Sequence, residues 1–171
     1  MASHFHALKV KEVRKESPDC VSLAFEVPAA AQQDFTFTQG QYLTIKANIQ
    51  GTELRRSYSI CSAPSENELR VAIKRVDGGV FSTWANTSIQ AGDTLEVMSP
   101  QGKFFTPLQY DACKSYVAFA AGSGITPIIS IIKETLAKES NSTFTLVYSN
   151  RSRSSIIFFE ALEALKNKYL Q

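Results

Sequence analysis

The sequence has few metal-binding residues and no long hydrophobic run. It contains 3 cysteines and 2 histidines among 171 residues. Cys20, Cys61 and Cys113 lie far apart and form no Cys-x-x-Cys pair, so neither a zinc site nor an iron–sulfur cluster is encoded within these residues. The longest apolar runs are shorter than the roughly 20 residues that a membrane-spanning helix needs. We therefore expect three free thiols, no metal site and no membrane contact.

The chain also lacks a strong excess of either charge. Its 18 basic and 16 acidic residues leave a formal net charge of +2 at pH 7, which is too little to predict binding to a nucleic acid. The first residues lack the apolar segment and cleavage site of a secretory signal, so we expect a cytoplasmic protein. Basic residues do occur in local pairs, such as Arg55-Arg56 and Lys74-Arg75. Such pairs suit small phosphorylated ligands.

Residues 1–106 have the pattern of a small β-barrel. Short segments of β-forming residues alternate with turn residues, and one helix is predicted at 81–88 after a Gly-Gly pair. The predicted strands cover residues 8–13, 21–27, 42–47, 54–60, 69–76 and 94–98. Six strands and one helix predict an antiparallel Greek-key barrel.

From residue 115 onward, strands and helices alternate. Apolar strands are predicted at 116–120 and 144–148, and they are followed by helices at 125–138 and 154–169. This order predicts a doubly wound parallel α/β sheet. Because the strands are continuously apolar, we expect them to be buried on both faces.

The predicted sheet is short for a nucleotide-binding fold. Such a sheet usually has five or six strands, and only two precede Gln171. We expect a barrel domain at 1–108 and a partial, truncated α/β domain at 109–171. The chain is accordingly expected to be a fragment of a longer protein.

Three short motifs carry the chemistry, and the first ends a predicted strand. In Arg55-Arg56-Ser57-Tyr58-Ser59, alternation places Arg56 and Tyr58 on one face and the two serines on the other. An arginine can hold a diphosphate through two hydrogen bonds, and a tyrosine ring can lie against a flavin. A serine at the flavin edge would add a small hydrogen-bonding group. The alternative for this segment is an exposed arginine beside a half-buried barrel tyrosine.

The second motif, Gly78-Gly79-Val80-Phe81-Ser82, opens the predicted helix. Unpaired amides at a helix N-terminus and the helix dipole both favour a bound phosphate, and the Ser82 hydroxyl can donate a further hydrogen bond. A plain glycine turn before a surface helix is the alternative.

The third motif, AGSGITP at residues 121–127, joins an apolar strand to an apolar helix. A dinucleotide-binding loop requires this context. The motif has Gly122 and Gly124 but a proline at the last position of GxGxxG, so it departs from the ordinary fingerprint. Its place after the other two motifs strengthens the prediction that it binds a nucleotide.

In the order RxYS, GGxxS and GxGxxP, these motifs resemble those of the ferredoxin–NADP reductase superfamily. The phrases FTFTQGQYLTI, RRSYSICSAP, VAIKRVDGGVFSTW and GDTLEVMSPQGKF are most similar to the reductase components of phenylacetyl-CoA epoxidases, which serve phenylacetate degradation. The resemblance covers essentially all 171 residues. It implies FAD in the barrel, NAD(P)H on the sheet, and electron transfer to an oxygenase or epoxidase component through a [2Fe-2S] domain.

Two parts of that family pattern are not found among these residues. One is the superfamily's C-terminal Cys-Gly-x-Pro segment, and the other is the iron–sulfur domain of the subfamily. The resemblance therefore implies that the [2Fe-2S] cluster belongs to a C-terminal region of the parent protein. We do not expect full turnover from the 171 residues alone.

The resemblance also implies which residues bind FAD. Arg56 and the segment 79–82 would hold the pyrophosphate, Tyr58 would pack on the isoalloxazine, and Ser59 would lie near its reactive N5. Residues 73 and 74 would border the flavin and ribityl chain through their backbone. The full implied set is Arg56, Ser57, Tyr58, Ser59, Ile73, Lys74, Gly79, Val80, Phe81 and Ser82.

For the nicotinamide nucleotide, the resemblance implies contacts with Gly122, Gly124 and Thr126. Thr126 would also touch the flavin. Ser59 and Thr126 are therefore the two residues that the resemblance places closest to the reacting atoms.

The segment after the second α/β strand predicts NADP in preference to NAD. NAD-specific sheets usually carry an acidic residue at this point, which holds the ribose hydroxyls. Residues 147–155 read VYSNRSRSS, with no acid and with Arg151 and Arg153. A 2′-phosphate would find cations and several hydroxyls there. The alternative is that both arginines are solvated loop residues.

Together, these patterns predict a FAD-dependent oxidoreductase that takes hydride from NAD(P)H and passes electrons to an iron–sulfur centre. Two other functions stay open. One is a stand-alone flavin reductase or NADH oxidase, and the other is a non-catalytic barrel that serves as a scaffold. No pair of carboxylates and no nucleophile–base pair points to other active-site chemistry.

Overall fold

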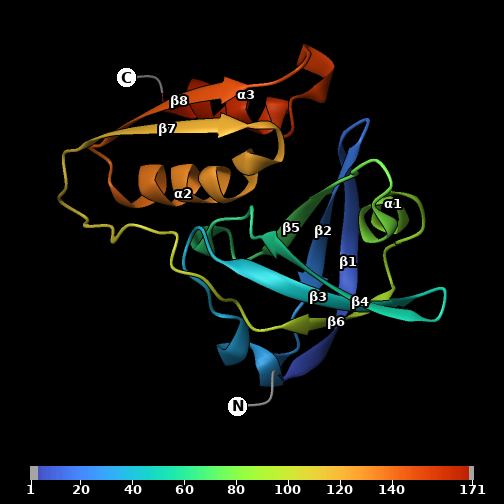
Figure 1. The fold of residues 1–171 in the computed structure, drawn as a ribbon. Coiled ribbons are helices and arrows are strands. Elements are labelled where there is room, and N and C mark those ends of the chain that lie inside the picture. The colour runs from blue at the N-terminus through green and yellow to red at the C-terminus, as the bar shows by residue number, and fades with distance from the viewer. Residues whose placement is uncertain (1–3, 170–171) are drawn as a thin grey trace.

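The computed structural model describes residues 4–169 and consists of an antiparallel barrel beside a small parallel sheet (Figure 1). The barrel strands follow the order β4-β3-β6-β1-β2-β5. They are β1 (Phe5–Ser17), β2 (Cys20–Glu26), β3 (Tyr42–Ile49), β4 (Thr52–Ser59), β5 (Leu69–Lys74) and β6 (Thr94–Met98). Because β6 lies between β1 and β3, the connectivity is that of a Greek key, which confirms the predicted barrel.

The two outermost strands of this sheet meet at one end. Ile60, directly after β4, forms a bridge with Val71 of β5, and the Cys61 N–H donates to the Arg70 carbonyl at 2.9 Å. The interior is filled by alternate apolar residues of the strands, such as Leu43 and Ile45, which are fully buried. Short 3-10 turns lie between strands, at Ala29–Ala31, Gln33–Phe35 and Pro64–Glu66.

Helix α1 (Val80–Thr87) covers part of the barrel core. It begins at the Gly-Gly pair, as predicted, and Gly78 has φ +71°, a conformation that residues with a Cβ rarely adopt. Phe81 and Ala85 are buried among the barrel's apolar side chains. These two side chains attach the helix to the barrel.

The second unit has the βαβα order that the sequence predicts. Its strands β7 (Ser115–Ala121) and β8 (Thr143–Ser149) pair in parallel. Between them lie a 3-10 turn at Gly122–Gly124 and helix α2 (Ile125–Lys138), and β8 leads to a 3-10 turn at Arg153–Ser155 and helix α3 (Phe159–Lys168). The order and direction of the elements confirm a parallel α/β sheet.

Two details that the sequence predicted for the α/β unit, the burial of its strands and the start of its last helix, are wrong. The strands are not buried on both faces, because both helices pack on the face that carries Ala118 and Leu146. On the other face, Val117 is 61% and Phe119 76% exposed within the part of the chain that the structure describes. The last helix begins at Phe159, not at residue 154.

Local hydrogen bonds explain the late start of α3. The Ser155 hydroxyl donates to the Ser152 carbonyl and accepts from the Ser152 N–H, at 2.8 and 3.1 Å. Serine side chains of this kind compete with helical hydrogen bonds. Phe158 then adopts φ +62°, outside the helical region. The helix therefore begins at least one turn later in the sequence than predicted.

The two units contact each other through α2 and the Pro64–Glu66 turn. The Ser130 hydroxyl donates to the Ser62 carbonyl at 2.6 Å, and the Ser65 N–H donates to the Glu134 carboxylate at 2.9 Å. Lys133 and Glu66 form an ion pair at 3.0 Å. These polar contacts join the α/β sheet to the barrel.

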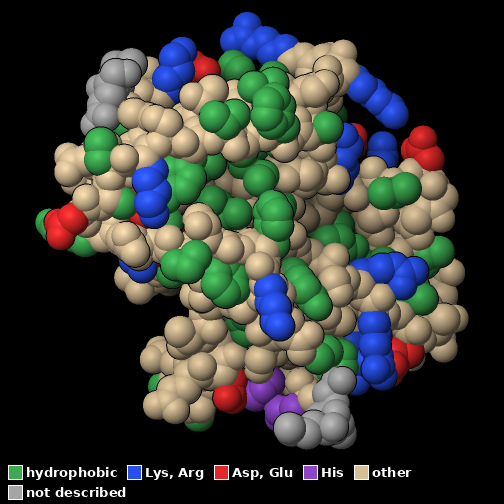
Figure 2. Space-filling model, turned by 60° about the vertical axis from the view of Figure 1, so that its left-hand side comes forward, with side chains coloured by type: hydrophobic (Ala, Val, Ile, Leu, Met, Phe, Trp, Pro, Cys, Tyr) green, Lys and Arg blue, Asp and Glu red, His purple; other side chains and the backbone are tan. Residues whose placement is uncertain are grey.

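A linker of residues 99–114 connects the two units along one side of the molecule (Figure 1). Figure 2 shows this side, where hydrophobic side chains are spread among polar ones with separate Lys and Arg side chains between them. Phe104 and Tyr110 of the linker are exposed. Among residues 4–169, no helix is long and apolar enough to cross a membrane.

Candidate functional site

The two neighbouring arginines of β4 have different surroundings. Arg55 pairs with Glu53 at 2.7 Å, and its guanidinium lies over the Phe5 ring at 5.3 Å. Arg56 points to the opposite face, on the same side as Tyr58, because the strand pairs with β3 in regular register. Within residues 4–169 Arg56 has no acidic partner, and its only side-chain hydrogen bond goes to the Arg55 carbonyl. Arg56 is therefore the cation of this strand that remains available to a ligand.

Tyr58 connects this face of β4 to the first turn of α1. Its ring centroid lies 5.7 Å from that of Phe81. Burial raises the pKa of Tyr58 to about 12, although the Arg56 charge acts in the opposite direction. The phenol is therefore neutral at physiological pH and can donate a hydrogen bond. The side chain is half-buried, and a partly exposed aromatic ring can pack on a planar ligand.

The serines on either side of Tyr58 also lie where alternation places them. The Ser57 hydroxyl shares a hydrogen bond with that of Thr44 on β3 at 2.9 Å. Ser59 is half-buried and is the last residue of β4. Ser59 has no side-chain hydrogen bond within the described residues, so its hydroxyl is available.

The N-terminus of α1 has backbone donors without a partner among the described residues. The N–H groups of Val80, Phe81 and Ser82 have no backbone acceptor within residues 4–169. The Ser82 hydroxyl accepts from the Val76 N–H at 3.1 Å and donates to the Gly79 carbonyl at 3.3 Å, which tightens the turn. Three free amides and the helix dipole favour a phosphate here.

The turn before α1 is tight, and a hollow lies beside it. A Cβ on Gly79 would lie only 2.6 Å from the Ser82 hydroxyl oxygen, so the tight turn requires glycine. Beside it, a hollow of about 600 Å³ opens between the start of α1 and the turn that joins β3 to β4; Gly79 and Val80 line it, but Arg56 and Tyr58 do not. A neutral tyrosine ring, an unpaired arginine and three free amides fit a flavin that carries a diphosphate.

The glycine loop of the α/β unit is a 3-10 turn at the N-terminus of α2. Gly122 has φ +50°, and its carbonyl accepts a hydrogen bond from the Tyr148 hydroxyl at 2.8 Å. Gly124 has open space where a Cβ would stand. Thr126 is buried and donates to the Ser123 carbonyl at 3.0 Å. The loop thus presents backbone to a ligand at the carboxyl end of β7, where open α/β sheets bind nucleotides.

A lysine of the barrel, Lys74, lies close to this loop. A Cβ added to Gly122 would lie 3.8 Å from Lys74 Nζ, so the ammonium of β5 faces the glycine loop of the other unit. Lys74 pairs with Asp19 at 3.5 Å. Sequence reasoning assigned only the backbone of Lys74 to the site and did not include Asp19. Ile73 is buried, and its carbonyl accepts from the Asn86 amide at 3.0 Å.

The two arginines after β8 also differ. Arg151 is exposed and has no ion pair within residues 4–169. The Arg153 guanidinium lies over the Phe159 ring at 4.9 Å. The adjacent serines offer hydroxyls: the Ser152 and Ser154 oxygens lie 3.0 Å apart. Arg151 is the freer of the two cations at this end of the sheet.

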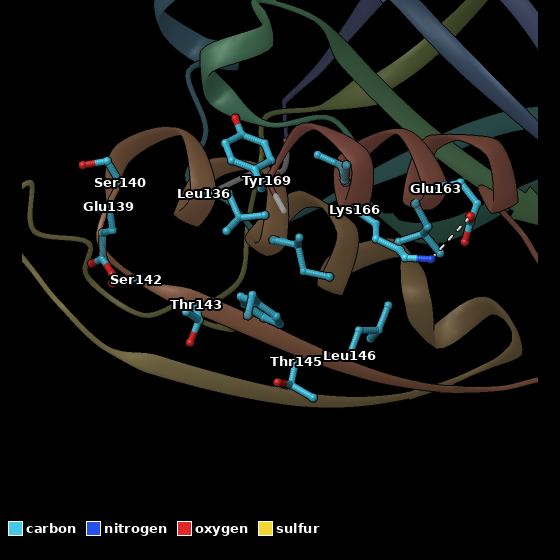
Figure 3. A pocket seen from close by; sticks show the side chains of 14 residues that line it. Leu136, Glu139, Ser140, Ser142, Thr143, Thr145, Leu146, Glu163, Lys166 and Tyr169 are labelled. Carbon is cyan, nitrogen blue, oxygen red and sulfur yellow. Dashed lines mark hydrogen bonds and ion pairs between the residues drawn. The ribbon is translucent and has the colours of Figure 1, made fainter. Parts of the chain in front are cut away.

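A further hollow of about 480 Å³ lies between α2, β8 and α3 (Figure 3). Leu136 and Leu146 line its apolar part, and Glu139 lies at one end. None of the residues predicted to bind a cofactor lines it. It is therefore separate from the candidate site.

A barrel with free amides at a helix N-terminus, facing a glycine loop on a parallel sheet, is typical of a class of flavin- and dinucleotide-binding oxidoreductases. Residues 7–106 match the family described as oxidoreductase FAD-binding domain, and residues 119–171 match the oxidoreductase NAD-binding domain. The chain belongs to this family of ferredoxin–NADP reductase type, which confirms the resemblance stated above.

Individual relatives place the chain more closely. It is 48% identical to a subunit of the 1,2-phenylacetyl-CoA epoxidase of Escherichia coli K12, over 98% of this chain and 47% of that protein. It is 40% identical to the ferredoxin reductase component of 3-ketosteroid-9-alpha-monooxygenase of Rhodococcus rhodochrous, over 95% of this chain and 46% of that protein. The chain thus spans about half the length of the curated relatives it matches.

Among solved structures, phthalate dioxygenase reductase superposes with a TM-score of 0.75 and 31% identity. The match covers 92% of this chain and 47% of that one. That reductase is described as a modular structure for electron transfer from pyridine nucleotides to [2Fe-2S]. Relatives and structure therefore agree on oxidoreductase domains that bind FAD and a nicotinamide nucleotide.

Proposed function

We propose that the chain forms the FAD- and pyridine-nucleotide-binding part of a reductase that delivers electrons to an oxygenase or epoxidase component through an iron–sulfur domain. The observation that carries this proposal is the approach of Lys74 to Gly122, which brings the flavin-type barrel and the dinucleotide loop to one place. When bound, FAD would supply the step from two-electron to one-electron transfer. The residues of the chain would bind, orient and shield the reactants.

Each group of residues has a proposed task. Arg56 and the amides of Val80, Phe81 and Ser82 would hold the diphosphate, since within residues 4–169 Arg56 has no acidic partner and these amides have no backbone acceptor. Tyr58 would support the flavin ring.

We also propose a domain boundary at 108/109.

Hydride transfer would occur between the barrel and the glycine loop. Gly122 and Gly124 would let the nucleotide approach the backbone, and Ser59 and Thr126 would lie closest to the reacting rings. Ser59 has a free hydroxyl for this task, whereas the Thr126 hydroxyl orders the loop through Ser123. We propose phenylacetyl-CoA epoxidation as the system served, on the basis of the E. coli relative, and a cytoplasmic location, where NADPH is available.

A direct test is to mix the purified chain with FAD, remove the excess and record the visible spectrum. We expect one FAD per chain, and we expect NADPH added without oxygen to bleach the flavin absorbance. Bleaching would show that both ligands meet in one site. A chain that retains no FAD at any concentration tested would contradict the proposal.

The coenzyme preference follows from Arg151. A charge-assisted hydrogen bond to the 2′-phosphate is worth roughly 1.5–3 kcal/mol, so Arg151→Ala is expected to weaken NADPH binding about tenfold or more. NADH binding should be unchanged. Arg153→Ala is a matched comparison, and we expect a smaller loss because that guanidinium already stacks on Phe159. Calorimetric titration of the FAD-loaded chain with NADP⁺ and NAD⁺, which cannot reduce the flavin, measures both effects, and equal binding of the two coenzymes by the unchanged protein would refute the assignment.

A further inference from the structure

Asp19 lies at the turn between β1 and β2, far in sequence from every motif of the site, yet it contacts the lysine that faces the glycine loop. Its Oδ2 lies 3.5 Å from Lys74 Nζ. Lys74 Nζ in turn lies 3.8 Å from the position of a Cβ on Gly122. A chain of contacts therefore runs from the barrel hairpin, through the end of β5, to the loop at the start of α2.

The aspartate itself is held at several points. The Ser17 hydroxyl donates to its Oδ1 at 2.7 Å, and the Arg75 N–H donates to its carbonyl at 2.7 Å. Strand pairing also places Cys20 opposite Lys74. The carboxylate is thus anchored independently of the lysine.

The lysine, in contrast, needs a partner to be held in one position. Its ammonium stands at the end of a flexible four-carbon side chain, which has many rotamers in the absence of a contact. An ammonium has three donors, and one carboxylate does not use them all. A lysine held by Asp19 retains donors that can point toward the glycine loop.

We propose that Asp19 is a positioning residue, which holds the Lys74 ammonium in front of Gly122 so that it meets the pyrophosphate of the incoming nicotinamide dinucleotide. The glycine loop at a helix N-terminus is where such a fold places this pyrophosphate. Lys74 adds a cation from the other unit, and Asp19 acts only through it. The inference rests on the proposed function and extends it to a residue outside all three motifs.

A double-mutant cycle on the FAD-loaded chain tests this role. The dissociation constant of NADP⁺ is measured for the unchanged protein, Asp19→Asn, Lys74→Met and the double variant. We expect Asp19→Asn to weaken NADP⁺ binding about fivefold and Lys74→Met about tenfold. In the Lys74→Met background, Asp19→Asn should have no further effect. The FAD dissociation constant should be the same in the unchanged protein and in Asp19→Asn, because Asp19 lies outside the implied FAD-binding set.

Two more variants exclude a merely structural effect. Asp19→Glu keeps the charge and should restore most of the affinity, whereas Glu26→Gln removes an exposed carboxylate at the other end of β2 and should change nothing. Unchanged or tighter NADP⁺ binding in Asp19→Asn overturns the inference, as does an equal loss in the Lys74→Met background. Those results leave the proposed function standing if the unchanged protein binds NADP⁺. Absence of NADP⁺ binding in the unchanged FAD-loaded protein overturns both.

Discussion

Replacing Arg56 by alanine is expected to weaken FAD binding about tenfold or more. The guanidinium has no acidic partner within residues 4–169. A bound diphosphate would therefore displace only water from it and would not have to break an ion pair within the protein. Hydrogen bonds between charged groups are worth roughly 1.5–3 kcal/mol, which corresponds to at least about a tenfold change in the dissociation constant. Fluorescence titration of the apoprotein with FAD measures this dissociation constant.

Arg55→Ala is the matched control for this change. Arg55 is the adjacent residue of the same strand, but it faces the other side and is already paired with Glu53. We expect its loss to leave FAD affinity within about twofold, because an exposed charge that is already paired has a small electrostatic effect on the other face of the strand. Equal FAD affinity in Arg56→Ala and the unchanged protein would remove the main assignment in the barrel.

Replacing Glu139 by alanine should destabilise the fold by about 3 kcal/mol, because several donors lose a buried acceptor. The fully buried carboxylate accepts from the Gln109 N–H at 2.9 Å, the Tyr116 hydroxyl at 2.9 Å and the Ser142 hydroxyl at 2.8 Å. It thereby ties the linker and β7 to the C-terminus of α2. Urea unfolding followed by circular dichroism gives the free energy of unfolding. Glu163→Ala is the control: it removes an exposed ion pair at 3.8 Å and should lower the free energy of unfolding by less than about 1 kcal/mol.

The Glu139 carboxylate should also make stability depend on pH. Burial opposes its ionisation, but the hydrogen bonds from Gln109, Ser142 and Tyr116 outweigh burial and hold its pKa below the usual range. Because the pKa is lower in the folded than in the unfolded protein, the carboxylate contributes stability above the unfolded value, and this contribution is lost as the pH falls through the folded value. The difference in stability between the unchanged protein and Glu139→Gln should therefore shrink on acidification. A constant difference from neutral to acidic pH would contradict this account.

Much of the architecture was predictable from periodicity. The helix predicted at 125–138 is observed at Ile125–Lys138, and each of the six barrel strands overlaps its predicted range. Alternation also placed Arg56 and Tyr58 on one face of β4 correctly. These features follow from the neighbours of each residue along the chain, because apolar spacing and turn residues act locally.

Other features depended on contacts that no local pattern records. The strand β7 is continuously apolar after its first residue, Ser115, yet the helices cover only one of its faces. The start of α3 depends on serine hydroxyls that compete with helical hydrogen bonds. An apolar run indicates which residues favour burial, but the packing of other elements determines which of these residues are covered.

The sequence by itself determined the class of fold, the three motifs and the type of ligand they suit, since each motif is a contiguous set of residues with its own backbone requirement. Only the tertiary structure decided which charges are free and which are paired. Arg55 and Arg56 are neighbours in sequence, but one is neutralised by Glu53 and the other is not. Asp19 meets Lys74 because β2 and β5 pair side by side. Electrostatic partners are selected by distance in space, and the folding of strands far apart in sequence sets that distance.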